Sequence, residues 1–155
     1  MELNPGDVIR WNDFPHGRDK LERTKPFWFI VWFTPGSLDD ETDKVILHRF
    51  TGQWEKYEKG GEREKNPHRT FRRPPFDNFD STCVLDFTEE FYDSFTLAAI
   101  LKYKQDIEPK GKIAPNQMPE TFHKLLNDGE YSKKQKRLIR SALQRAGYSG
   151  LKEVR

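Results

Sequence analysis

Residues 27–33 are Phe-Trp-Phe-Ile-Val-Trp-Phe, and this stretch decides the fold. It contains only aromatic and β-branched residues, and it lies between Pro26 and Pro35. Such residues favour strands, and a run without polar alternation is typical of a strand buried on both faces. The sequence therefore predicts a strand over 27–33 that is covered on both sides.

Further strands are predicted on both sides of this run. Val8 and Ile9 lie in a short strand over 7–11, which ends where the turn-prone stretch 12–19 begins. The segment 44–51 predicts a third strand, and the segment 82–87 predicts another.

The C-terminal part, residues 118–155, predicts helices. Pro119 suits a first helical position, and Gly129 suits a helix end. Ser132 and Gln135 form a capping-box pattern, and the helix that follows keeps one apolar face as far as Gly147. Antiparallel strands followed by helices indicate an α+β protein, a small β-barrel with a helical appendage, in a single domain over 1–155.

Composition narrows the class of protein. The chain has 155 residues, of which 34% are charged and 14% aromatic, so a few large side chains must fill one core. One cysteine, Cys83, excludes an internal disulfide and, with four histidines, is too little for a structural zinc site. No Gly-rich phosphate loop, His-x-x-x-His helix or nucleophile motif is present, so we expect neither a metal nor another cofactor. Residues 1–5 lack the features of a signal peptide and no apolar run approaches the roughly 20 residues of a membrane helix, which predicts a cytoplasmic protein without a membrane partner.

Charge is distributed unevenly along the chain. The net charge is +2, but residues 131–155 hold eight Lys or Arg against one acid, Glu153, and so carry +7. This asymmetry favours an anionic partner. A basic helix that simply presents a solvated face explains the same pattern, and the sequence leaves both interpretations open.

The segment 52–80 predicts a long charged loop. Gly60-Gly61, Pro67 and Pro74-Pro75 interrupt it, and it offers little apolar material for a core. Long loops of this kind in compact domains are usually functional or disordered. Its middle mixes cations with an aromatic ring, which suits phosphate contacts and base stacking, at His68, Arg69, Phe71, Arg72 and Arg73. A surface hairpin whose charges nearly cancel is the alternative.

Several short motifs follow one another in an order that can be compared with that of a known family. They are Pro-Gly-Asp-Val-Ile at 5–9, Asp-Phe-Pro at 13–15 with Gly17, and Lys25-Pro26 directly before an apolar strand. Later come the strand 44–51, which ends in Thr51, and Asp-Ser-Thr-Cys-Val-Leu-Asp at 80–86. Together they resemble the MazF/PemK family, ribosome-independent mRNA endoribonucleases of toxin–antitoxin pairs.

The resemblance implies a small SH3-like β-barrel that forms a homodimer and binds single-stranded RNA, with an antitoxin protein as a further partner. It also implies metal-independent cleavage, in which the 2′-hydroxyl attacks the adjacent phosphodiester and hydrogen-bond donors stabilise the phosphorane charge. The family relies on the Arg of an Arg-Pro pair and on a strand-end Thr. Thr51 matches this Thr, whereas Lys25 stands in the Arg position and lacks the planar fork of a guanidinium.

The segments 16–26 and 48–51 lie at strand ends and supply the other candidates. Arg23 can provide a guanidinium near Lys25, and histidines titrate near neutral pH. We therefore expect catalysis from Lys25, Thr51, Arg23 and His48. We expect RNA contacts from His16, Arg18 and Arg49, together with His68, Arg69, Phe71, Arg72 and Arg73 of the long loop.

Two other functions compete with an endoribonuclease. The first is a non-catalytic barrel that binds RNA or a protein partner, which Lys25 and the long loop favour. The second is a DNA-binding regulator that uses the basic helix over 132–146. The second is weaker, because the cations surround an apolar stripe and no preceding helix is spaced for a helix-turn-helix.

Overall fold

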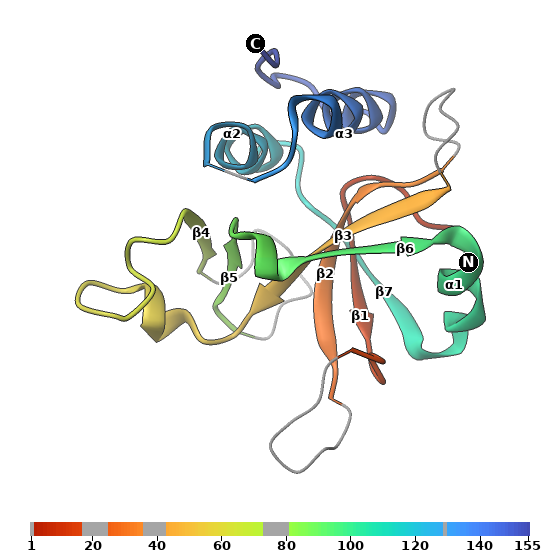
Figure 1. The fold of residues 1–155 in the computed structure, drawn as a ribbon, viewed down its shortest axis with the longest axis horizontal. Helices are drawn as coiled ribbons and strands as arrows, with labels where there is room; N and C mark the ends of the chain where they lie inside the picture. The colour runs from red at the N-terminus through yellow and green to blue at the C-terminus, as the bar shows by residue number, and fades with distance from the viewer. Residues whose placement is uncertain (1, 17–24, 36–42, 73–80, 129) are drawn as a thin grey trace.

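The structure is a computed structural model that describes residues 2–16, 25–35, 43–72, 81–128 and 130–155 (Figure 1). The strands are β1 (Asp7–Trp11), β2 (Phe27–Phe33), β3 (Lys44–Thr51), β4 (His68–Phe71), β5 (Cys83–Asp86), β6 (Tyr92–Thr96) and β7 (Ile107–Lys112). The α-helices are α1 (Leu97–Lys102), α2 (Met118–Asp128) and α3 (Lys133–Arg145), and three 3-10 helices are η1 (Trp54–Tyr57), η2 (Glu89–Phe91) and η3 (Lys104–Asp106). The prediction of an α+β protein with C-terminal helices is confirmed.

Within the described residues, all strand pairs are antiparallel and belong to one seven-stranded sheet. Its order is β4-β5-β3-β2-β1-β7, and β6 pairs with β3 on the edge that β5 also uses. No pair of described strands joins either end of this order to the other, so the sheet is not closed into the predicted barrel. The chain between β6 and β7 instead forms α1 and η3, and Ile100 of α1 fills the core there.

Strand β2 is buried on both faces, as its composition predicts. Trp28, Ile30 and Trp32 face one core, whereas Phe29 and Val31 face the other. Phe33 breaks this alternation and packs in the same core as Trp32, because the register between β2 and β3 shifts between Val31 and Phe33. Propensity alone does not reveal such a bulge.

Two hydrophobic cores therefore lie on the two faces of the sheet. The first joins the sheet to α2 and α3, through Phe122 of α2 and Leu143 of α3 among others. The second gathers around Trp11, Phe14 and Ile100. Figure 1 shows α2 and α3 as a separate layer beside the sheet, while α1 lies next to β6 and β7.

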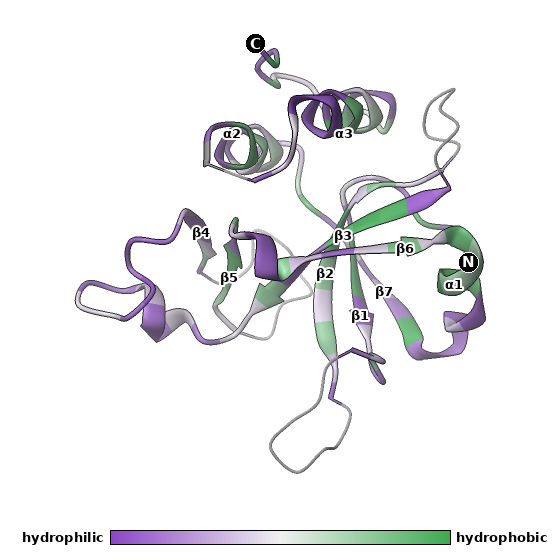
Figure 2. Cartoon of the chain, in the orientation of Figure 1, coloured by the Kyte–Doolittle hydropathy of each residue, from purple (hydrophilic) through white to green (hydrophobic). Residues whose placement is uncertain are grey.

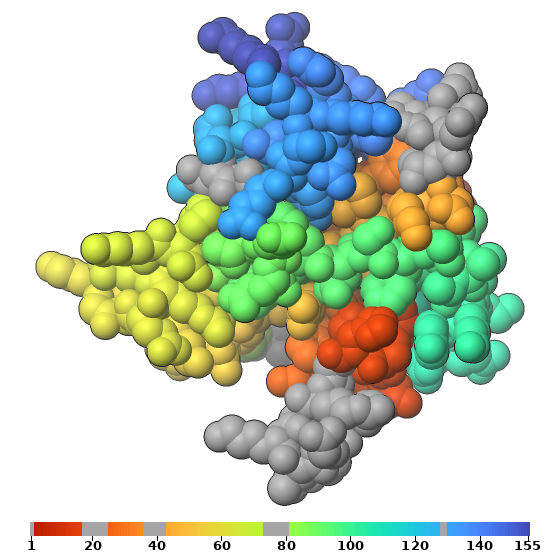
Figure 3. Space-filling model, in the orientation of Figure 1, coloured from red at the N-terminus to blue at the C-terminus, as the bar shows by residue number. Residues whose placement is uncertain are grey.

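Residues 52–72, here called the excursion, form ordered structure where the sequence predicted a long charged loop. Figure 2 shows that most of its residues are hydrophilic, and Figure 3 shows that it stands out from the body of the molecule (yellow). It nevertheless contains η1 and β4, and it places Tyr57 and Phe71 in buried positions. The remaining part of the predicted loop, residues 73–80, lies outside the described residues.

A buried carboxylate anchors the excursion to the sheet. Asp86 of β5 is fully buried, and its Oδ2 accepts hydrogen bonds from the Tyr57 hydroxyl at 2.5 Å and from Asn66 Nδ2 at 3.0 Å. Its Oδ1 accepts from the backbone N–H and the hydroxyl of Thr88, at 2.9 and 2.7 Å. Burial by itself would raise the pKa of Asp86, but these donors outweigh it and lower the pKa below its usual range. Asp86 is therefore held as a carboxylate.

Candidate functional site

A groove forms where the end of β3 lies beside the start of β2. The antiparallel register pairs Trp28 with Phe50 and Phe29 with Arg49. Lys25, just before β2, and Thr51, the last residue of β3, consequently line the same groove, which has a volume of about 420 Å³. We call it the Thr51 groove. It brings together the predicted Lys25, Arg49 and Thr51, and it adds Arg63, Glu90 and Phe91, which the sequence did not single out.

Cations surround an aromatic ring at the base of the Thr51 groove. The Nζ of Lys25 lies 5.0 Å from the ring centroid of Phe27, and the Cζ of Arg49 lies 5.5 Å from it. Both distances are within the range of cation–π attraction. The ring thus holds two positive charges near Thr51.

Arg49 is held in place by the segment that follows β5. Its Nη2 donates to the carbonyl of Glu90 at 2.7 Å, and its Nε lies 3.0 Å from Oδ2 of Asp93 as an ion pair. Burial raises the pKa of Asp93, and the nearby Arg49 opposes that rise. Arg49 therefore contributes charge to the groove, while part of its hydrogen-bonding capacity is already used.

Thr51 presents a hydroxyl that accepts one hydrogen bond from the backbone. The backbone N–H of Gln53 donates to Thr51 Oγ1 at 3.2 Å. This contact directs a lone pair toward the turn after β3 and leaves the O–H proton able to donate to a bound anion. The residue is partly buried at the strand end.

Arg63 enters the groove from the excursion. Its guanidinium lies over two rings, with Cζ 5.9 Å from the centroid of Tyr57 and 5.6 Å from that of Phe91. Its Nη1 is 3.5 Å from the Tyr57 hydroxyl, at the long limit of a hydrogen bond. No local pattern distinguishes Arg63 from the charged residues around it, because its position depends on contacts with residues far along the chain.

His48 is in the core and not in the groove, so the prediction that it titrates at the site is wrong. Trp32 Nε1 donates to His48 Nδ1 at 3.2 Å, and His48 Nε2 lies 2.6 Å from the carbonyl of Asp86. The ring is fully buried, and this burial lowers its pKa to about 3. Two occupied nitrogens and a neutral ring make His48 a residue that joins β2, β3 and β5.

In the middle of the predicted loop, most of the candidate side chains are buried or already form contacts within the protein. Phe71 is 3% exposed and packs against Phe50, so it offers no free ring for base stacking. Arg69 donates to the Gln117 carbonyl at 2.7 Å and pairs with Glu120 at 3.1 Å, which ties β4 to α2. His68 Nδ1 lies 2.6 Å from the carbonyl of Asn66. None of the three lines the Thr51 groove.

The remaining candidates lie apart from the groove or outside the description. Arg72 is exposed and forms an ion pair with Glu58. His16 is exposed, and its ring stacks on Phe95 with the centroids 5.5 Å apart. Arg18, Arg23 and Arg73 lie outside the described residues, so their expected roles remain predictions.

Comparisons with known proteins assign this chain to no family. No protein-family model matches the sequence, and no curated protein matches it. Within the described ranges, no group of three or more His, Cys, Asp or Glu side chains is arranged to hold a metal ion. The same part of the chain contains no helix that is long and apolar enough to span a membrane.

Proposed function

We propose that this protein is a MazF/PemK-like endoribonuclease that cleaves single-stranded RNA without a metal and acts as the toxin of a toxin–antitoxin pair. The observation that carries the proposal is the Thr51 groove, which gathers Lys25, Arg49, Arg63 and a threonine hydroxyl around aromatic rings. Cations suit the phosphates of RNA, and aromatic faces suit its unpaired bases.

The chemistry assigns a role to each group. The 2′-oxygen attacks the adjacent phosphorus and the bond from phosphorus to the 5′-oxygen breaks, which leaves a 2′,3′-cyclic phosphate and a 5′-hydroxyl. Thr51 and Arg63 donate to the phosphorane oxygens, and Lys25 protonates the leaving 5′-oxygen. Glu90, the one carboxylate among the described residues of the groove, accepts the proton of the 2′-hydroxyl.

Strand connectivity supports an SH3-like arrangement. β1, β2, β3 and β6 are successive antiparallel neighbours, and β7 returns to pair with β1 after short helical turns. In this proposal a homodimer and an antitoxin partner follow from the same family resemblance.

A non-catalytic RNA-binding module is the second candidate. It is favoured by Lys25, which offers no bidentate fork, and by the burial of His48, which removes one expected proton carrier from the groove. Such a module would hold RNA through the same cations without breaking it.

The test is incubation of the purified protein with a long single-stranded RNA. We expect cleavage that is lost in Lys25→Ala and in Thr51→Val, which keeps the branched shape but removes the hydroxyl. Thr51→Ser, which keeps the hydroxyl, is the matched control and should still cut. RNA that is bound but intact would favour the binding module, and RNA that is neither bound nor cut would contradict both functions.

A further inference from the structure

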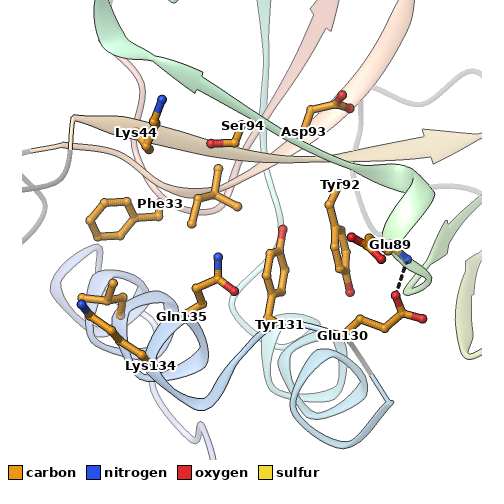
Figure 4. A pocket seen from close by; sticks show the side chains of 12 residues that line it. Phe33, Lys44, Glu89, Tyr92, Asp93, Ser94, Glu130, Tyr131, Lys134 and Gln135 are labelled. Atoms are coloured by element: carbon orange, nitrogen blue, oxygen red, sulfur yellow. Dashed lines mark hydrogen bonds between the residues drawn. The ribbon is translucent and has the colours of Figure 1, made fainter.

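A second cavity lies between the sheet and the start of α3 (Figure 4). It has a volume of about 550 Å³, a size usual for small-molecule sites. Phe33, Ile46 and Leu138 form its apolar part. Tyr131, just before α3, stands in its middle, so we call it the Tyr131 cavity.

Tyr131 presents a buried hydroxyl without a partner. Its ring stacks on Tyr92 with the centroids 4.0 Å apart and the planes 13° apart, and the residue is only 9% exposed. Among the described residues its hydroxyl makes no hydrogen bond, whereas the hydroxyl of Tyr92 donates to the Phe87 carbonyl at 2.9 Å. Burial raises the pKa of Tyr131, so the group stays an O–H donor. Buried donors in proteins usually have a partner, so an unpaired hydroxyl that lines a cavity can be satisfied by a ligand or an ordered water there.

Gln135 adds a second donor from the first turn of α3. Its Oε1 accepts from the backbone N–H of Ser132 at 3.1 Å, while Ser132 Oγ accepts from the backbone N–H of Gln135 at 3.1 Å. This capping box fixes the side-chain amide and turns its Nε2 toward the cavity (Figure 4). The cavity therefore offers hydrogen-bond donors from Tyr131 and Gln135 beside an aromatic face.

Charges around the cavity differ between its two ends. Lys44 and Lys134 lie at the end formed by Phe33, and Glu89 and Glu130 lie at the end formed by Tyr92 (Figure 4). A third acid of the lining, Asp93, forms an ion pair with Arg49. An anionic group is consequently favoured at the lysine end and disfavoured at the other.

We propose that the Tyr131 cavity binds one splayed-out nucleotide of a single-stranded RNA, with a keto-bearing base, guanine or uracil, at the donors of Tyr131 and Gln135 and its phosphate toward Lys134. Tyr131 and the amide of Gln135 both donate, so they match the carbonyl oxygens of these bases. On the corresponding edge of adenine or cytosine, the same two donors would face an amino group, which is also a donor. The cavity thereby supplies a base preference that the Thr51 groove, built of rings and cations, lacks.

Helix η2 lies between the two sites. The choice of RNA as the ligand of the cavity rests on the proposed function. Glu89 and Tyr92 line the Tyr131 cavity, while Glu90 and Phe91 line the Thr51 groove. Neighbouring residues of one short segment thus belong to both sites.

Calorimetric titration with UMP, GMP, AMP and CMP tests the cavity without relying on RNA cleavage. We expect UMP and GMP to bind at least about fivefold more tightly than CMP and AMP, the difference that one satisfied hydrogen bond makes. Tyr131→Phe should abolish this preference while the protein stays folded, because it deletes a hydroxyl that has no partner. Tyr103→Phe, which packs on the second core and lies outside the cavity lining, is the matched control and should keep the preference.

Each outcome separates the inference from the proposed function. Equal binding of the four nucleotides, no binding, or a preference that survives in Tyr131→Phe would overturn the inference, even if the protein cuts RNA. A keto preference that depends on Tyr131 would support it, even if Thr51→Val and the wild type show no difference on RNA.

Discussion

Alternation of side chains along β3 separates His48 from the candidate site residues Arg49 and Thr51. Arg49 and Thr51 line the Thr51 groove, whereas His48 bonds within the core; Phe50 is buried against Phe71 and also forms part of the groove lining. Positions that differ by one residue on a strand face opposite sides. A histidine beside a functional arginine is therefore no better placed for chemistry than any other core residue.

At the residue scale, Arg63 should matter more than its neighbours in the excursion. We expect Arg63→Ala to weaken RNA binding about tenfold or more, because a hydrogen bond to a charged group is worth about 1.5–3 kcal/mol. Arg63→Lys should recover only part of the loss, since it restores the charge without the fork. Filter binding at fixed salt measures the effect, and Lys59→Ala, an exposed cation outside the groove lining, is the control. Equal losses in Arg63→Ala and Lys59→Ala would remove Arg63 from the site.

The buried ring of His48 predicts a pH dependence of stability. In the unfolded chain it gains a proton below about pH 6.5, whereas in the folded chain it stays neutral down to about pH 3. The unfolded state binds more protons between these values, so the free energy of unfolding should fall as the pH is lowered through this window. The slope that His48 adds is at most about 1.4 kcal/mol per pH unit.

Urea unfolding of the wild type and His48→Gln from pH 4 to pH 8 checks this dependence. The variant should be less stable at pH 7, and below pH 6 it should lose stability with falling pH less steeply than the wild type. Above pH 7 the two slopes should agree. Parallel curves over the whole range would show that His48 is not buried in its neutral form.

At the scale of elements, the excursion is a support for the groove and not a free loop. The Tyr57 hydroxyl bonds to the Asp86 carboxylate and also lies next to Arg63, so it links the anchor to the groove. The contacts of η1 and β4 with β5 give the excursion a fixed position. Its role in the proposed function is to carry Arg63 to Thr51.

Tyr57→Phe tests whether the contact of the excursion with Asp86 also supports RNA binding in the Thr51 groove. We expect the free energy of unfolding to drop by about 1.5–3 kcal/mol, because a buried carboxylate loses a donor. We also expect weaker RNA binding through the displacement of Arg63, although Tyr57 itself is not in the groove lining. Thermal unfolding and filter binding are the measurements. Tyr103→Phe, in the second core, is the control, and an unchanged RNA affinity in Tyr57→Phe would contradict the supporting role.

Sequence patterns predict the elements whose cause is local. The run 27–33 identifies β2 through its composition, and Ser132 with Gln135 identifies the start of α3 through its cap. The sequence does not predict β7, because the strand contains Pro109 and Gly111, which are unusual in strands. The sequence predicts a loop where β4 forms, because the partner strand β5 lies beyond residues of irregular composition.

The candidate site likewise contains residues that a local sequence pattern predicts and residues that it does not. Lys25 and Thr51 were predicted, since both follow from where strands begin and end. Arg63 and the partners of Asp86 were not, because their contacts join segments that are distant along the chain. Phe71 was misjudged for the opposite reason: an aromatic ring among cations resembles a stacking residue until its burial is known.

At the scale of the whole molecule, the sheet holds two sites that η2 joins. In our proposals, the Thr51 groove supplies cations and a hydroxyl for chemistry on a phosphodiester, and the Tyr131 cavity supplies donors for a base. The basic segment 131–155 forms α3 and the chain after it, next to the cavity. Under the proposed function, an RNA partner would account for the uneven charge of the chain.

The most direct measurement is the mapping of RNA ends after incubation with the EDTA-treated protein. The substrates are an oligoribonucleotide that contains the mapped cut and the same molecule with one 2′-deoxynucleotide on the 5′ side of the cut. Our account predicts 2′,3′-cyclic phosphate and 5′-hydroxyl ends in the first substrate, no cut at that position in the second, and no cut by Thr51→Val in either. Cutting of the 2′-deoxy substrate at the same position, or full activity in Thr51→Val, would contradict it.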